Sequence, residues 1–233
     1  MKASPLITAI SDGFAFVRGP QSSGDPTYRE KAVIITPFMF LYASVYLFLN
    51  HFPVEAPHLL PMLRIDQDIP FLVWTVFPYS VLLASGILLP MFIRSRELIY
   101  RTMSAYVVSL AINATIWALY PTIYPRPPAP GGGSLTEAYY LLMMQLDTPL
   151  NCLPSGHITS PAVMAWAVAR ENPRYAKAIW ISYAILAVSV LTTKQHYFWD
   201  IAAGVSCAAF AVFLVNSLAD RKDQLLSNRR ADV

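Results

Sequence analysis

Long apolar runs constrain the fold of this chain more than any other feature of its sequence. A helix needs about 20 apolar residues to cross the hydrocarbon core of a bilayer. Charged residues make up only 13% of the chain, whereas soluble domains carry roughly 25%. This pattern predicts an all-α integral membrane protein, a polytopic bundle of about six transmembrane helices. The predicted helices cover residues 32–50, 70–93, 99–120, 157–169, 178–194 and 200–218.

Basic residues are distributed unevenly between the two ends of the predicted helices. All Lys and Arg residues except Arg64, Arg126 and Lys194 fall in segments on one side. Cytoplasmic segments of membrane proteins carry the excess of Lys and Arg, so both termini are predicted to be cytoplasmic. The net charge of +3 is too small to indicate nucleic-acid binding.

This layout divides the chain into three parts. Residues 1–31 are predicted to be a cytoplasmic segment that lies as a helix against the lipid headgroups. Residues 32–218 form the membrane domain with its six spans. Residues 219–233 form a basic cytoplasmic tail that anchors the last span.

Two histidines fall on the side that is poor in basic residues. His196 and Asp200 are four residues apart, which is one turn of a helix. A carboxylate at that spacing can accept a hydrogen bond from one imidazole nitrogen, which fixes the tautomer and leaves the other nitrogen basic. Because ionisable groups at membrane depth are costly and mark functional sites, the pair is a candidate for catalysis.

The second histidine belongs to a short motif, Pro154-Ser155-Gly156-His157, at the start of the fourth predicted helix. Ser155 offers a hydroxyl donor, and Gly156 lets the backbone approach a ligand closely. The free N–H groups at a helix start favour an anion. Two histidines beside such an anion site suit phosphoryl transfer, in which one attacks phosphorus and the other protonates the leaving oxygen.

Cations on the same side of the bilayer support this interpretation. Arg126 and Lys194 would lie at the level of the histidines, where they could balance the charge of a phosphoryl group. The spacing of His196 and Asp200 also allows a metal site, but the neighbouring cations favour an anion.

These motifs together resemble the type 2 phosphatidic acid phosphatase superfamily of membrane phosphatases and phosphotransferases. That family's pattern has three pieces, K-x6-R-P, P-S-G-H and S-R-x5-H-x3-D. The order of the pieces and the layout of six spans extend the resemblance over about residues 32–218. The matching positions are Arg126-Pro127 for the first piece, 154–157 for the second, and Ser189, His196 and Asp200 for the third.

The resemblance implies a role for each of these residues. His196 would be the nucleophile that forms a phosphohistidine, Asp200 would orient it, and His157 would be the general acid. The phosphate would be held by Arg126, Ser155 and the Gly156 amide. The resemblance implies no metal and no cofactor.

Two positions depart from the family pattern. Leu119 stands where the pattern has Lys, and Val190 stands where it has Arg, so two phosphate-binding cations are absent. Lys194 follows Val190 by four residues on the same predicted helical face, and we hypothesise that it replaces one of these charges. The loss of cations also resembles the branch that contains the inositol phosphorylceramide and sphingomyelin synthases, which pass a headgroup to a lipid alcohol.

The sequence therefore predicts a metal-independent enzyme of the plasma or inner membrane with its active site on the outer side. Its predicted reaction is hydrolysis of a lipid phosphate or diphosphate that remains in the bilayer. Transfer of a phospho-headgroup between lipids is the alternative, and it uses the same residues. A transporter or an inactive scaffold is a third reading, although no internal repeat supports transport. The identity of the lipid and the oligomeric state stay open.

Overall fold

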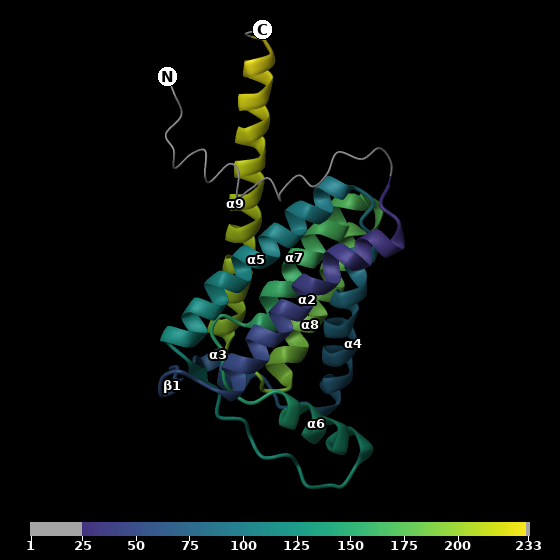
Figure 1. The fold of residues 1–233 in the computed structure, drawn as a ribbon. Coiled ribbons are helices and arrows are strands. Elements are labelled where there is room, and N and C mark those ends of the chain that lie inside the picture. Colours follow the sequence, from purple (N-terminus) through teal and green to yellow (C-terminus); the bar gives the residue numbers. More distant parts are fainter. Residues whose placement is uncertain (1–24, 232–233) are drawn as a thin grey trace.

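The computed structural model describes residues 25–231 and is a bundle of helices, which confirms the predicted all-α class (Figure 1). Each of the six predicted apolar segments contains one helix. These helices are α2 (Tyr28–His51), α4 (Val76–Leu88), α5 (Arg96–Leu119), α7 (Gly156–Glu171), α8 (Ala176–Thr192) and α9 (Phe198–Ala231). Short 3-10 turns flank some of them, namely η2 (Val73–Thr75), η3 (Leu89–Phe92) and η4 (Pro173–Tyr175).

The helices differ in whether they are long enough to cross a bilayer. Four in the described part of the chain are long and apolar enough, at Tyr28–His51, Arg96–Leu119, Pro173–Thr192 and Phe198–Arg221. By contrast, α4 has 13 residues and α7 has 16. Most residues of α7 are buried, since it packs against α5, α8 and α9. A helix surrounded by protein does not have to match the bilayer thickness along its own length.

Short polar side chains fix where several helices begin. The Thr27 side chain accepts a hydrogen bond from the Glu30 amide, and the Glu30 carboxylate accepts one from the Thr27 amide, which forms a capping box for α2. Ser95 caps α5 in the simpler way, by accepting from the Leu98 amide.

The core of the bundle lies between α5, α7 and α9. Its buried apolar residues include Met103, Trp117 and Val163. Small residues let α7 and α9 approach closely, because a Cβ atom at Gly204 would lie 3.0 Å from the Ser155 carbonyl oxygen. This contact places the start of α7 against the first turns of α9, so two segments far apart in sequence meet at one end of the bundle.

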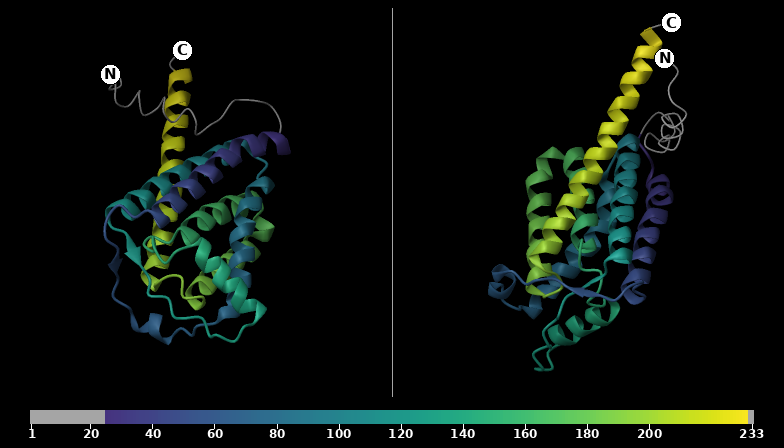
Figure 2. Two further views of the ribbon diagram at one scale, coloured as in Figure 1. Left: turned by 60° about the horizontal axis from the view of Figure 1, so that its bottom comes forward. Right: turned by 90° about the vertical axis from the view of Figure 1, so that its left-hand side faces the viewer.

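The two ends of the bundle are built differently (Figures 1 and 2). At one end α9 extends beyond the other helices. The opposite end carries three short elements and α6, which lies beside α4 and η2. These elements are α3 (Arg64–Asp68), α6 (Leu135–Leu146) and the parallel strands β1 (His58–Leu59) and β2 (Thr122–Ile123).

Two predicted boundaries differ from the structure. Residues 1–24 of the predicted N-terminal segment, 1–31, lie outside the described residues, and α2 begins at Tyr28, before the predicted start of the first span at residue 32. The last helix does not end near residue 218, because α9 continues through most of the basic tail to Ala231.

The sequence analysis did not predict α6. Ser134 caps this helix by accepting from the Glu137 amide. The Glu137 carboxylate accepts from the backbone amides of Gly131 and Gly133 at the end of the glycine-rich loop. At 12 residues, α6 is much shorter than a membrane span, so it has no apolar run of the length that marks one. The pair Ser134 and Glu137 is nevertheless a sequence signature of a helix start.

Candidate active site

The two histidines predicted from the sequence meet at the end of the bundle that carries α6. His157 lies at the start of α7, and His196 lies in the connection between α8 and α9. Nδ1 of His157 is 3.2 Å from Nε2 of His196, and both side chains are buried. The rings come from segments 39 residues apart, so the fold brings together what the sequence only suggested.

Asp200 lies against His196 as the spacing predicts. Its Oδ2 atom is 3.0 Å from Nδ1 of His196 and also accepts a hydrogen bond from the Tyr197 amide at 2.9 Å. Because the carboxylate is fully buried in the first turn of α9, it holds the His196 ring in one orientation.

The hydrogen-bond network indicates where the protons lie between the two rings. His196 donates from Nδ1 to the Asp200 carboxylate, so its Nε2 atom is an acceptor. His157 then donates from Nδ1 to that Nε2 atom, while its own Nε2 lies 3.2 Å from the Tyr79 hydroxyl. The free electron pair of His196 therefore points toward His157.

A second carboxylate, Asp147, lies on the far side of His157. Its Oδ2 atom is 3.5 Å from Nε2 of His157, and its Oδ1 atom accepts a hydrogen bond from the Tyr46 hydroxyl. Tyr46 and Tyr79 also pack edge-on against the His157 ring, each with a centroid distance of 5.5 Å. The two histidines are thus bracketed by two carboxylates, one beside each ring.

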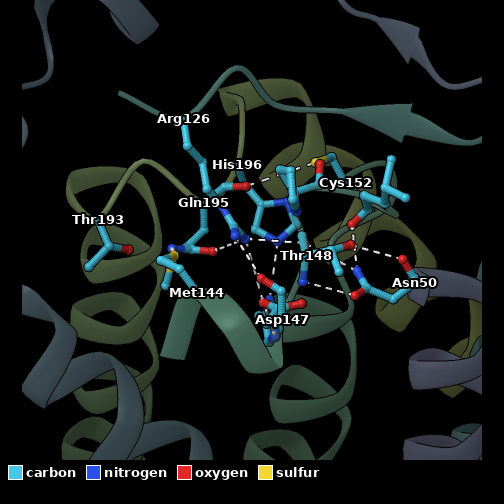
Figure 3. Close-up of polar contacts among 12 residues, drawn as sticks. Asn50, Arg126, Met144, Asp147, Thr148, Cys152, Thr193, Gln195 and His196 are labelled. Atoms are coloured by element: carbon cyan, nitrogen blue, oxygen red, sulfur yellow. Dashed lines mark hydrogen bonds and ion pairs between the residues drawn. The ribbon is translucent and has the colours of Figure 1, made fainter. Parts of the chain in front are cut away.

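Arg126 contacts the Asp147 residue that lies beside His157 (Figure 3). The guanidinium donates to the backbone carbonyls of Asp147 at 2.6 Å and Thr148 at 3.2 Å, and to the Gln195 side-chain oxygen. One guanidinium nitrogen is also 3.8 Å from Oδ2 of Asp147. Arg126 therefore lies beside the histidine pair with most of its donors already engaged by protein atoms.

Asn50 holds the same loop from the opposite side (Figure 3). Its side chain accepts from the Thr148 amide at 2.9 Å and donates to the carbonyls of Thr148 and Leu150. The Thr148 hydroxyl in turn donates to the Asn50 carbonyl at 2.8 Å. This double clamp, from the end of α2 and from Arg126, fixes the position of Asp147.

Lys194 is not brought to the histidine pair in the way the sequence suggested. The helix α8 ends at Thr192, and Lys194 has a φ of 55°, so it does not continue the helical face of Val190. Its ammonium donates instead to the carbonyls of Asp66 at 2.7 Å and Ile69 at 2.6 Å. Burial lowers the pKa of Lys194, and the nearby Asp66 carboxylate opposes that change.

Asp66 joins the short helix α3 to the start of α9. Its carboxylate accepts from the Leu63 amide at 2.8 Å, at the start of α3, and from the Phe198 amide at 2.7 Å, at the start of α9. A carboxylate at a helix start is stabilised by the helix dipole. Asp66 and Lys194 therefore fix where α9 begins, and with it the position of Asp200.

Ser155 and Gly156 lie at the first turn of α7, beside His157. The Ser155 hydroxyl is buried and makes no hydrogen bond to any described residue. Gly156 packs closely against α5, because a Cβ atom there would lie 3.2 Å from the Trp117 ring. The Trp117 indole donates to the Pro154 carbonyl at 3.0 Å and so supports the motif from beneath.

Unpaired polar atoms gather at this end of the bundle. In the part of the chain that the structure describes, eight buried side-chain nitrogen or oxygen atoms have no hydrogen-bond partner. Most of them surround the histidine pair, and buried polar groups without partners call for an explanation such as a binding site. They are Arg126 Nε, Asn151 Nδ2 and Oδ1, Ser155 Oγ and Asp200 Oδ1.

Cys152, His196 and Asp200 could offer ligand atoms to a cation, since these atoms lie within 4.8 Å of one another. However, burial raises the pKa of the Cys152 thiol well above its usual value, which keeps it protonated and opposes metal binding. The Cys152 thiol also donates to the Pro149 carbonyl at 3.2 Å. The residues present therefore fit an anion site better than a metal site.

An apolar cavity of about 290 Å³ adjoins His157. It lies between α2, α4 and α7, and its walls include Tyr42, Tyr46, Leu83 and Met164. The cavity links the buried imidazole to the apolar part of the bundle, where the hydrocarbon part of a lipid could lie.

The sequence analysis missed several residues that contact the histidines or hold their partners. Tyr46 and Tyr79 lie inside apolar runs, where aromatic residues are common and give no separate signal. The sequence analysis gave Asp147 no catalytic or phosphate-binding role. An acidic residue in a segment otherwise close to membrane depth is the signal that could have identified it.

Comparison with known protein families matches residues 51–214, more than half of the chain, to the family model described as the PAP2 superfamily. The matched range contains Arg126, Asp147, His157, His196 and Asp200. A search of curated proteins finds no match to this chain.

Proposed function

The chain belongs to the PAP2 superfamily, and from this premise we propose that it cleaves a phosphate ester or diphosphate of a lipid through a phosphohistidine intermediate. Membership supports a phosphatase or phosphotransferase type of lipid enzyme. The observation that carries the finer proposal is the hydrogen-bonded series Asp200, His196 and His157, in which one braced imidazole faces another.

The proposed first step uses both rings. Nε2 of His196 attacks phosphorus and forms a P–N bond while the P–O bond to the lipid alcohol breaks. In this step His157 acts as an imidazolium whose Nε2–H faces the Tyr79 hydroxyl and the Asp147 carboxylate. It gives its Nδ1 proton to the departing oxygen and becomes a neutral imidazole, so the lipid alcohol leaves neutral. For this step the phosphoryl group must enter between the rings and replace their direct hydrogen bond.

The second proposed step regenerates the enzyme. A water molecule attacks the phosphohistidine, the P–N bond breaks, and His157 takes the proton that the water loses. Arg126 and the Ser155 hydroxyl would stabilise the charge on the phosphoryl oxygens. The cavity beside His157 supports a substrate whose hydrocarbon chains stay among α2, α4 and α7.

Transfer to a lipid alcohol is the second candidate function, and the same cavity favours it. The site is buried, with His157 8% and His196 4% exposed, and the adjoining space is mostly apolar. An alcohol group carried on a hydrocarbon chain could approach the phosphohistidine from this space in place of water. The product would then be a new phospholipid with no release of phosphate.

We further propose that the reaction takes place on the non-cytoplasmic face of the membrane. The support is the distribution of charge, since the end with the histidines has few cations. The opposite end carries Arg96 and Arg101, which form ion pairs with Glu30 and Asp220.

The test of this proposal is an assay of purified protein in detergent with a panel of lipid phosphates and diphosphates. Release of phosphate is measured with and without a lipid alcohol as acceptor. His196→Ala is expected to abolish turnover and His157→Ala to reduce it by about 10²-fold or more. If both variants fold and remain as active as the wild type, the proposed chemistry is wrong.

A further inference from the structure

We infer that Asp147 makes the pocket select a singly charged phosphodiester over a doubly charged phosphomonoester. This inference deepens the proposed function and rests on it, because it concerns the substrate of the same histidine pair. It starts from the charges that the fold places around the two rings.

The positive charge beside the histidines is small. Within residues 25–231, Arg126 is the cation that contacts this group of residues, and Lys194 is held by carbonyls of the α3 segment. Val190, at the position of a family cation, is fully buried in an apolar cluster with Tyr79 and Ile158. The position of the other family cation, Leu119, is apolar and 73% exposed at the end of α5.

The negative charge is correspondingly large. Asp147 lies 3.5 Å from His157 and 3.8 Å from Arg126, so it opposes the charge of the guanidinium that would bind a phosphoryl group. Asp200 contributes a second carboxylate beside His196. A phosphoryl group between the rings would therefore meet two carboxylates, and the cations that balance them would be the Arg126 guanidinium and the His157 imidazolium.

Asp147 is a built part of the site. Its loop is clamped by Asn50 on one side and by Arg126 on the other. Its carboxylate receives the Tyr46 hydroxyl and has little contact with solvent. The negative charge therefore stays in the pocket when a substrate arrives.

The two classes of ester differ by one charge. A phosphomonoester has a second pKa near 6 and is doubly charged at neutral pH, whereas a phosphodiester carries one negative charge. Repulsion between like charges a few ångströms apart is strong where water is excluded. A pocket with this balance of charges favours the ester with the smaller charge, in which the second substituent on phosphorus replaces an anionic oxygen.

The experiment compares two probes that share one lipid, a diacylglycerol phosphate and its methyl phosphodiester. Release of diacylglycerol, the product common to both, is measured with the purified full-length protein, and kcat/KM is obtained for each. The wild type is expected to prefer the diester by about tenfold or more. Equal rates or a preference for the monoester in the wild type would overturn the inference.

The Asp147→Asn variant tests the residue itself. It removes the charge but keeps a side chain of the same shape, so kcat/KM for the monoester should rise relative to the diester by about tenfold. The control is Glu137→Gln, which removes a buried carboxylate of α6 that bonds to Gly131 and Gly133, and its ratio of rates should equal that of the wild type. A purely structural role of Asp147 would lower both rates together and leave the ratio unchanged, and that result would overturn the inference.

A second measurement does not depend on whether the variant folds. As pH falls below about 6, the monoester gains a proton and becomes singly charged, so the wild-type preference for the diester should shrink. A ratio that stays constant between pH 8 and pH 5 contradicts selection by charge. If the wild type cleaves neither ester any faster than His196→Ala does, the proposed function fails, whereas cleavage without charge preference defeats this inference alone.

Discussion

Two regions meet at the candidate active site and differ in how they hold a histidine. In the corner between α8 and α9, His196 precedes α9 and has its Nδ1 atom on a single carboxylate, that of Asp200 in the first turn of α9. At the start of α7, His157 faces the Tyr79 hydroxyl and the Asp147 carboxylate with one nitrogen. The first region fixes one tautomer, and the second leaves a choice of partner for a proton.

This difference matches the two tasks that the proposed reaction requires. A nucleophile must present one basic nitrogen in a constant direction, which a carboxylate four residues away achieves. A general acid and base must hold a proton and release it, which is easier when its second nitrogen has both a hydroxyl and a carboxylate within reach. The contrast teaches that local spacing can build the first arrangement, while the second needs tertiary contacts.

The largest expected effect on activity is at Asp200, which holds the His196 ring. Asp200→Asn keeps the size of the side chain but removes the charge that fixes the His196 tautomer, so turnover should fall by about 10³-fold. The measurement is kcat for lipid phosphate cleavage, with thermal unfolding in detergent to confirm that the variant folds. A loss of turnover of less than tenfold would mean that His196 does not depend on this carboxylate for its orientation, so the two regions would not differ as described.

An intermediate effect is expected at the start of α7. Ser155→Ala removes a buried hydroxyl that has no partner within the described chain, so stability should stay within about 0.5 kcal/mol of the wild type. If the hydroxyl binds the phosphoryl group, kcat/KM should fall by about tenfold to hundredfold.

The matched control for Ser155 is Thr159→Val, one turn further along α7. The Thr159 hydroxyl donates to the Ser155 carbonyl at 2.9 Å, and among the described residues it makes no hydrogen bond to either histidine. Its loss should lower the unfolding temperature slightly and leave activity unchanged. If Ser155→Ala lowered stability without affecting kcat/KM while Thr159→Val lowered activity, Ser155 would stabilise the fold and would not bind the substrate.

The smallest effect on activity is expected for Lys194→Met. The change removes two hydrogen bonds from the ammonium to the Asp66 and Ile69 carbonyls, which should cost about 1–3 kcal/mol of stability. Turnover should stay within about threefold of the wild type, since the lysine braces α3 and does not contact the imidazoles. A large loss of turnover with unchanged stability would restore Lys194 as a phosphate ligand.

Much of the bundle could be predicted because helix periodicity and bilayer thickness are local constraints. Each predicted apolar run contains a helix, and the spacing of His196 and Asp200 correctly indicated a contact between them, although His196 lies just before α9 begins. The exact extent of spans was harder to predict. α7 is short because neighbouring helices cover it, and no local pattern reports what surrounds a helix.

The rest of the site could not be predicted because it depends on where the chain turns after a helix ends and on contacts between distant segments. The expected alignment of Lys194 with Val190 assumed a helix that continued, whereas α8 ends at Thr192 and the chain turns. Asp147 reaches His157 only because Asn50 and Arg126, from two distant segments, clamp its loop. Such contacts between distant segments leave no periodic trace in a single sequence.

The length of α9 gives experimental access to the orientation of the protein. Its 34 residues span about 51 Å at 1.5 Å per residue, whereas the hydrocarbon core is only about 30 Å thick. The last turns of this helix therefore extend beyond the lipid chains. A cysteine-reactive dye that cannot cross membranes, directed to a thiol engineered there, would reveal which compartment that end faces, and by elimination where the imidazoles open.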